Sequence, residues 1–257
     1  MLEFVEKLTL CPWLMTSKDV TALQKAGFPD VTILHIVLGS AHFSYLNRMA
    51  DGIGIRFEYQ TEVPERSASP SNTKWPRVDV THPNRSESSS CWIAFPESSQ
   101  PITQSAGLHN LYRVMSSNPE ACRLVHDWRD YQMKATTSLD ARLRAQLALY
   151  VSGLNYCEYS IYWVTKSLQA LGESPFVCDR LASGQPPLGL RSKDQVIFLH
   201  AERLTREPAG TKEEHIQQLR NAGLDDRAIL QLTMLCSYLS FENRVALGLG
   251  IPIESER

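Results

Sequence analysis

The sequence has no surplus of positive charge. Its 257 residues include 26 lysines and arginines against 28 aspartates and glutamates, which gives a formal net charge of −2. Nucleic acids and anionic membrane surfaces are bound by basic patches, so neither is expected as a partner. No apolar run approaches the roughly 20 residues that a membrane-spanning helix needs. Glu3 and Glu6 stand where a signal peptide would carry basic residues, so a cytoplasmic location is expected.

The sequence also lacks any pair of cysteines in Cys-x-x-Cys spacing. The six cysteines are far apart: Cys11, Cys91, Cys122, Cys157, Cys178 and Cys236. In a reducing compartment such cysteines are mostly small buried apolar residues. No cluster of cysteine and histidine has the spacing of metal ligands, so no metal site is expected.

No segment of alternating apolar and polar residues indicates a β-strand, and the predicted fold class is all-α. The clearest helix is predicted by apolar residues at spacings of three and four: Leu139, Leu143, Leu147, Tyr150, Val151 and Leu154. By contrast, residues 63–101 contain nine serines and six prolines in 39 positions, which is typical of a linker or an irregular loop. Trp75, Trp92 and Phe95 within this stretch suggest that parts of it are held against a folded surface.

An internal repeat links the two ends of the chain. Residues 2–55 align with residues 198–251 at a constant offset of 196 without a gap, and 17 of the 54 aligned pairs are identical. Each copy is predicted to form two helices separated by a turn at a glycine, Gly27 or Gly223. Each copy ends in Gly-x-Gly-Ile, which follows a helix rather than a strand. That context excludes a dinucleotide-binding loop, and no cofactor is expected.

The second helix of each copy is long and apolar on nearly all sides. These helices are predicted around Ile33–Met49 and Ile229–Val245, and both are expected to be buried. Each contains an Asn-Arg pair, and the arginines Arg48 and Arg244 are expected to bind carbonyls or acids near a helix end. The two copies are expected to pack about a pseudo-twofold axis through these helices, as in isologous interfaces. The alternative is that the first copy completes a neighbouring chain.

The segment Ala145–Ser160, AQLALYVSGLNYCEYS, resembles the signature of the peroxidase-related branch of the alkylhydroperoxidase D/carboxymuconolactone decarboxylase superfamily. Leu219–Gly250 is similar to the closing pattern of the same branch. The resemblance covers residues 105–251 as one complete unit and residues 2–55 as a repeated half-unit. It implies an all-α helical bundle with the cysteine motif at a helix start. It also implies thiol-based reduction of hydroperoxides, in which two cysteines cycle between thiol and disulfide while a glutamate and a histidine carry protons.

Three of the four groups that this chemistry uses have no match in the sequence. Cys157 stands at the first cysteine of the motif, and Ser160 stands at the second, which is the more reactive one in the family. Ala145 occupies the position of the family glutamate, and Val164 that of the histidine. A serine cannot form a disulfide, and alanine and valine carry no protons. The candidate catalytic residues are therefore Cys157 and, at the second cysteine position, Ser160, and a dithiol cycle is not expected.

Two functions from different classes fit this pattern. The first is a degenerate member of the enzyme family, with weak or no hydroperoxide reduction and any residual chemistry at Cys157. The second is a non-catalytic protein whose former active-site cavity binds a small apolar ligand or supports an oligomer. The expected partners are a second copy of the chain and a small apolar ligand or hydroperoxide. Cys157 is interpreted either as a buried remnant or as a residual reactive thiol. Its candidate proton carriers, should the fold bring them near, are His109, His126, His200 and Glu202.

The predicted domain organisation has three parts. Residues 1–60 form the half-unit, residues 61–104 the linker, and residues 105–257 the complete domain. In two-unit proteins of this branch, a catalytic half precedes the segment that matches residues 2–55. Either that half was deleted here, or the chain begins further upstream.

Overall fold

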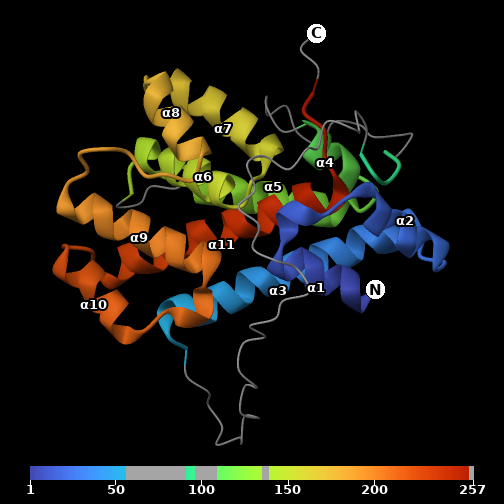
Figure 1. Cartoon of the computed structure of the whole chain (residues 1–257), viewed down its shortest axis with the longest axis horizontal. Coiled ribbons are helices and arrows are strands. Elements are labelled where there is room, and N and C mark those ends of the chain that lie inside the picture. Colours follow the sequence, from blue (N-terminus) through green and yellow to red (C-terminus); the bar gives the residue numbers. More distant parts are fainter. Residues whose placement is uncertain (56–90, 96–108, 135–138, 255–257) are drawn as a thin grey trace, which may run out of the picture.

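Every regular element in the described part of the chain is a helix. The computed structural model describes residues 1–55, 91–95, 109–134 and 139–254 (Figure 1). The α-helices are α1 (Leu2–Leu10), α2 (Ser17–Lys25), α3 (Asp30–Ile53), α4 (His109–Met115), α5 (Pro119–Lys134), α6 (Ala141–Leu154), α7 (Glu158–Ala170), α8 (Pro175–Ala182), α9 (Ser192–Arg206), α10 (Glu213–Asn221) and α11 (Asp226–Leu249). Two 3₁₀ turns are η1 (Pro12–Leu14) and η2 (Pro208–Gly210). The predicted all-α class is confirmed, and none of the described helices is long and apolar enough to cross a membrane.

The offset of 196 relates the boundaries of the helices as well as the sequences. It carries η1 onto η2, α2 onto α10 and α3 onto α11, with the same first and last positions. Similar local chemistry sets the start of the short helix in both copies. The backbone N–H of Thr16 donates to Asp19 Oδ2 at 2.7 Å, and the N–H of Lys212 donates to His215 Nδ1 at 2.9 Å. Each long helix ends at a left-handed glycine, which only a residue without Cβ adopts freely.

Helices α3 and α11 pack side by side along their length (Figure 1). A methyl group added to Gly52 would lie 2.6 Å from Thr233, and one added to Gly248 would lie 3.2 Å from Val37. At the offset of 196, Gly52 is equivalent to Gly248 and Val37 is equivalent to Thr233, so the two contacts are the same contact made in opposite directions. As the residue number rises on one helix it falls on the other, so the helices are antiparallel, and the contacts between the copies are reciprocal.

The two long helices differ in what covers their outer faces. Helix α11 is buried almost throughout, because it also contacts α5, α6, α7 and α9. Helix α3 is buried only on the side toward α11, α1, η2 and α9, and Phe43 and Leu46 on its outer face are 65% and 42% exposed. The expectation that both helices are buried is thus correct for α11 and wrong for the outer face of α3. The two helices share the apolar pattern, but in the described residues α5, α6 and α7 cover α11 and not the outer face of α3.

Most of the predicted linker lies outside the described residues, including Trp75. The described piece, residues 91–95, packs against the end of α11. The backbone N–H of Trp92 donates to the Leu249 carbonyl at 3.0 Å, and the Trp92 ring lies against Gly250. Phe95 packs on the same apolar cluster, so Trp92 and Phe95 hold this piece against the folded surface as expected.

Candidate functional site

The position of Cys157 is set by the way in which α6 ends. The N–H of Cys157 donates to the Ser152 carbonyl and the N–H of Tyr156 to the Gly153 carbonyl, which is the pattern of a Schellman motif. Tyr156 therefore takes the left-handed position, with φ of 52°, that glycine usually occupies. Its ring makes an edge-on contact with Trp13 of η1 at 5.9 Å, which helps to hold this conformation. One residue later Cys157 is the N-cap of α7, so the thiol is fixed between two helices.

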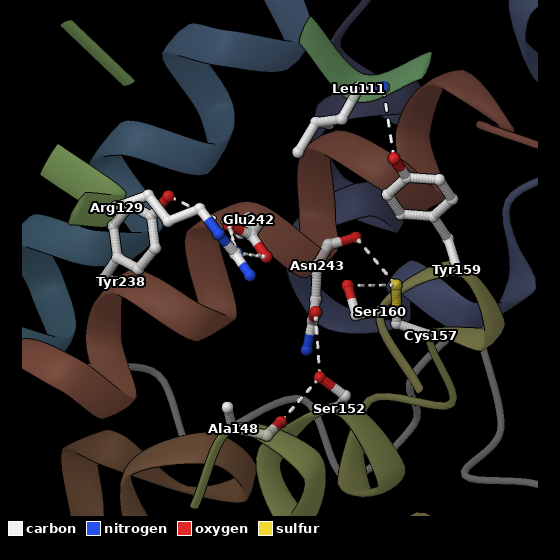
Figure 2. Close-up of polar contacts among 10 residues, drawn as sticks. All are labelled: Leu111, Arg129, Ala148, Ser152, Cys157, Tyr159, Ser160, Tyr238, Glu242 and Asn243. Carbon is white, nitrogen blue, oxygen red and sulfur yellow. Dashed lines mark hydrogen bonds and ion pairs between the residues drawn. The ribbon is translucent and has the colours of Figure 1, made fainter. Parts of the chain in front are cut away.

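The Cys157 thiol is fully buried and faces polar atoms of two helices (Figure 2). Its sulfur lies 3.3 Å from Ser160 Oγ, one turn along α7, and 3.9 Å from the Asn243 carbonyl of α11. The thiol donates to the Ser160 hydroxyl, and Ser160 is itself only 2% exposed. The structure thus brings together the two residues that the motif singled out, with a hydroxyl at hydrogen-bonding distance where the family pattern has a second thiol.

Asn243 connects this site to α6. Its side-chain amide lies 3.3 Å from Ser152 Oγ and donates to the Val151 carbonyl at 3.5 Å. Asn243 and Ser152 are both completely buried, where an unpaired amide or hydroxyl would be costly. The Asn of the Asn-Arg pair therefore fixes the distance between α11 and the helix that precedes Cys157.

The two positions where the resemblance would place proton carriers are apolar and buried. Ala145 and Val164 are each 4% exposed, and both belong to the apolar cluster that contains Leu147 and Leu168. Cys157 belongs instead to the cluster that includes Tyr159 and residues of α3. The thiol therefore lies at the junction of the two clusters, and neither Ala145 nor Val164 has a group that exchanges a proton.

An ion pair that the sequence analysis missed, between a buried carboxylate and a partly buried guanidinium, lies beside the site (Figure 2). Arg129 of α5 donates to the carboxylate of Glu242 on α11, and Tyr238 donates to the same carboxylate at 2.9 Å. Burial alone would lower the pKa of Arg129, but the Glu242 carboxylate outweighs burial and raises it. The available signal was an acid in the middle of an apolar helix, because a buried carboxylate requires a cation or several donors.

Two of the candidate proton carriers for Cys157, His200 and Glu202, form hydrogen bonds with residues outside the site. His200 Nε2 lies 3.2 Å from Thr233 Oγ1, and burial, followed by Arg203, lowers the pKa of His200 to about 4. Thr233 is ten residues before Asn243, or about 15 Å along α11. Glu202 accepts a hydrogen bond from Tyr150 at 3.3 Å.

The remaining two candidates lie on α4 and α5. His126 packs its ring 5.3 Å from Tyr112, and the side chain of His109 lies outside the described part of the chain. Among the described residues, no group of three or more histidines, cysteines or carboxylates has the arrangement of a metal site.

Comparison with known proteins identifies the fold. No family model matches the sequence, and no curated protein does. Solved structures do match. An uncharacterized peroxidase-related protein from Silicibacter sp. TM1040 has a TM-score of 0.53 at 22% identity, covering 55% of this chain and 74% of that chain. A peroxidase-related protein with an alkylhydroperoxidase AhpD core, from Ralstonia eutropha JMP134, has a TM-score of 0.53 at 18% identity, covering 56% and 76%.

A third match is ATU0492 from Agrobacterium tumefaciens, described as a putative antioxidant defence protein AhpD. It has a TM-score of 0.50 at 18% identity, covering 55% of this chain and 96% of that chain. At these identities the likeness shows the fold, and the three agree on which fold it is. The chain has the alkylhydroperoxidase D-like helical fold, as the motif around Cys157 predicted.

Proposed function

We propose that this chain is an alkylhydroperoxidase D-like protein in which the dithiol peroxidase site is degenerate. Hydroperoxide reduction is then weak or absent, and any residual thiol chemistry is confined to Cys157. The observation that carries the proposal is the pair of Cys157 and Ser160, with sulfur and hydroxyl 3.3 Å apart and both residues buried.

The chemistry of the family cycle explains why this pair is decisive. A thiolate attacks the outer peroxide oxygen, the O–O bond breaks, and the thiol becomes a sulfenic acid while the alcohol leaves. A second thiol then attacks the sulfenic sulfur, water leaves, and a disulfide forms. The Ser160 hydroxyl can hydrogen-bond to a sulfenic acid but cannot form that disulfide. Without a proton carrier at Ala145 or Val164, the alkoxide leaving group is also not protonated by the family route.

The test is turnover of cumene hydroperoxide with dithiothreitol as the reductant. We expect no turnover above that of Cys157→Ser. Turnover that is robust in the native protein and lost in Cys157→Ser would contradict the proposal. A gain-of-function arm uses Ser160→Cys, which places a second thiol at the observed position with little change in volume. On oxidation this variant should lose two hydrogens by mass as a disulfide forms with Cys157, and the native protein should not. Adding Ala145→Glu and Val164→His then tests whether the proton carriers restore turnover.

We also infer that residues 1–60 are a half-unit packed on a complete unit at 105–257. The reciprocal contacts of Gly52 and Gly248 and the matching helix boundaries support this division. The alternative functions, a small-ligand site in the former active-site cavity or an oligomeric scaffold, stay predictions.

A further inference from the structure

One apolar seam of the described chain is exposed over most of its length, and only its first residue, Ile36, packs against the core. It follows a heptad pattern along the outer face of α3: Ile36, Gly39, Phe43, Leu46, Ala50 and Ile53. Phe43 is 65%, Leu46 42% and Ile53 37% exposed. Spacings of three and four place all six residues in one narrow stripe, and none of them is charged.

The second copy of the repeat shows what such a seam normally does. The equivalent residues of α11 are Leu232, Leu235, Leu239, Glu242, Ala246 and Leu249, and each is at most 2% exposed. They are covered within the same chain by helices that include α5 and α6. All six heptad positions are therefore buried on α11, whereas four of them are exposed and two partly buried on α3.

The two seams differ at the position that decides the partner. Glu242 of α11 is paired with Arg129 of α5. The α11 seam therefore suits a covering helix that carries a positively charged side chain. Its equivalent on α3 is Leu46, which would leave an arginine of an α5-like helix without a counter-charge at a cost of several kcal/mol. Gly39 stands where α11 has Leu235. A helix shaped to pack on Leu235 would therefore leave a gap at Gly39. The α3 seam therefore suits an uncharged apolar partner.

We propose that the occupant is the same seam of a second copy, and that the chain forms a twofold dimer through antiparallel α3 helices. In an antiparallel heptad pair, positions with a constant sum of residue numbers face each other. With the sum at 89, Phe43 faces Leu46 of the partner subunit, Gly39 faces Ala50 of the partner subunit, and Ile36 faces Ile53 of the partner subunit. Large residues then meet at the centre, and the small pair on either side lets the backbones approach. The interface is isologous, as a twofold dimer requires.

The size of the seam sets the expected affinity. From residue 36 to residue 53 the helix rises about 26 Å, so one helix pair buries less than the about 1,200 Å² at which stable interfaces begin. We therefore expect a dimer that forms in the micromolar range and dissociates on dilution. The proposal does not depend on the activity of Cys157, which is fully buried and is not part of the seam.

Sedimentation equilibrium of the full chain over a hundredfold concentration range tests this dimer. The native protein should move from monomer to dimer as the concentration rises. Phe43→Glu and Leu46→Lys should each weaken dimerisation by about tenfold or more, because each buries an unpaired charge. The matched control is Phe176→Glu on α8, where the native side chain is similarly exposed at 61%, and it should leave dimerisation unchanged.

The double variant Phe43→Glu/Leu46→Lys tests the register. If residue 43 faces residue 46 of the partner, opposite charges now meet across the axis, and the double variant should dimerise more tightly than either single variant. A native protein that stays monomeric throughout, or a dimer that survives Phe43→Glu, overturns the proposal. A double variant no better than the single ones overturns the antiparallel register. Circular dichroism and melting curves establish that each variant is folded.

Discussion

The guanidinium of Arg244 on α11 donates a 2.9 Å hydrogen bond to the carbonyl oxygen of Thr9 on α1. Arg48 makes the equivalent bond of 3.2 Å to the carbonyl of Thr205. Both carbonyls lie in the last turn of a helix, where the helix dipole is negative and favours a cation. The expectation that these arginines bind carbonyls near a helix end is confirmed. Each copy of the repeat thus caps a helix of the other, which compensates in part for burying two like charges.

Replacing Arg244 by lysine should destabilise the protein although the charge is kept. A lysine cannot bridge the carbonyls of Ser240 and Thr9, which Arg244 contacts with two separate nitrogens. We expect Arg244→Lys to lower the free energy of unfolding by about 1–3 kcal/mol in urea. The control is Arg227→Lys on the exposed start of the same helix, with a change below about 0.5 kcal/mol. Equal effects at the two sites would contradict the capping role.

Gly52 and Gly39 of α3 should respond in opposite directions to alanine. A Cβ on Gly52 would lie 2.6 Å from Thr233 and 2.8 Å from Leu204, so the two copies must separate, at a cost of about 1–3 kcal/mol. A Cβ on Gly39 meets nothing within 4 Å, and alanine there should stabilise the helix by about 0.5–1 kcal/mol. Thermal melts of both variants at a concentration where sedimentation shows only monomer give the comparison. Stabilisation by Gly52→Ala would show that the close approach of α3 to α11 is wrong.

His200 should make the protein less stable in mild acid. Thr233 Oγ1 donates to the Ile229 carbonyl, so it accepts from His200 Nε2–H. Burial lowers the pKa of His200 from 6.5 to about 4. The unfolded chain therefore takes up a proton first as the pH falls. The contribution of neutral His200 to the free energy of unfolding is fully present above pH 6.5, and it decreases by up to about 3 kcal/mol by pH 4.

The variant His200→Gln isolates this effect. Glutamine keeps an N–H donor for Thr233 but does not titrate. Urea melts between pH 7.5 and pH 4 should therefore show a shallower acid loss for the variant than for the native protein. Parallel pH profiles would mean that His200 is not the group responsible.

Cys91 should be the first cysteine to react in the native protein, ahead of Cys157. Cys91 is only partly buried, and its thiol donates to the Leu249 carbonyl at 3.3 Å. Burial raises its pKa to about 11, so its alkylation rate should rise about tenfold per pH unit from pH 7 to 10. Cys157 is fully buried and should be labelled only on unfolding. Peptide mapping after iodoacetate treatment distinguishes the two, with Cys91→Ser as the control. Rapid labelling of Cys157 at neutral pH would contradict its burial and reopen a catalytic role.

Deleting residues 1–60 should expose the inner face of α11 and cause aggregation. That face contacts α1, η1 and α3, and Gly248 on it packs against the apolar side chains of Leu8 and Val37. The readout is light scattering and the melting temperature after expression of residues 61–257. A truncated protein that stays soluble with an unchanged melting temperature would show that the first copy adds nothing to the packing of α11.

The sequence by itself determined the features that depend on local chemistry. Helical periodicity, the glycines at 27 and 223 and the gapless repeat predicted the all-α class and the alignment of α3 with α11. The residues around Cys157 predicted the alkylhydroperoxidase D-like fold and the position of the thiol at a helix start. These predictions succeeded because helix ends and heptad patterns are written in neighbouring residues.

Only the tertiary structure decided which of two nearly equivalent patterns is covered. The seams of α3 and α11 share their periodicity, but the sequence does not say that α5 and α6 cover just one of them. Nor does it join Arg129 to Glu242, 113 residues apart, or place His200 against Thr233 rather than near Cys157. Each of these depends on contacts between distant segments. The free energy of burial depends on what packs against a residue, and that is a property of the folded chain rather than of its local sequence.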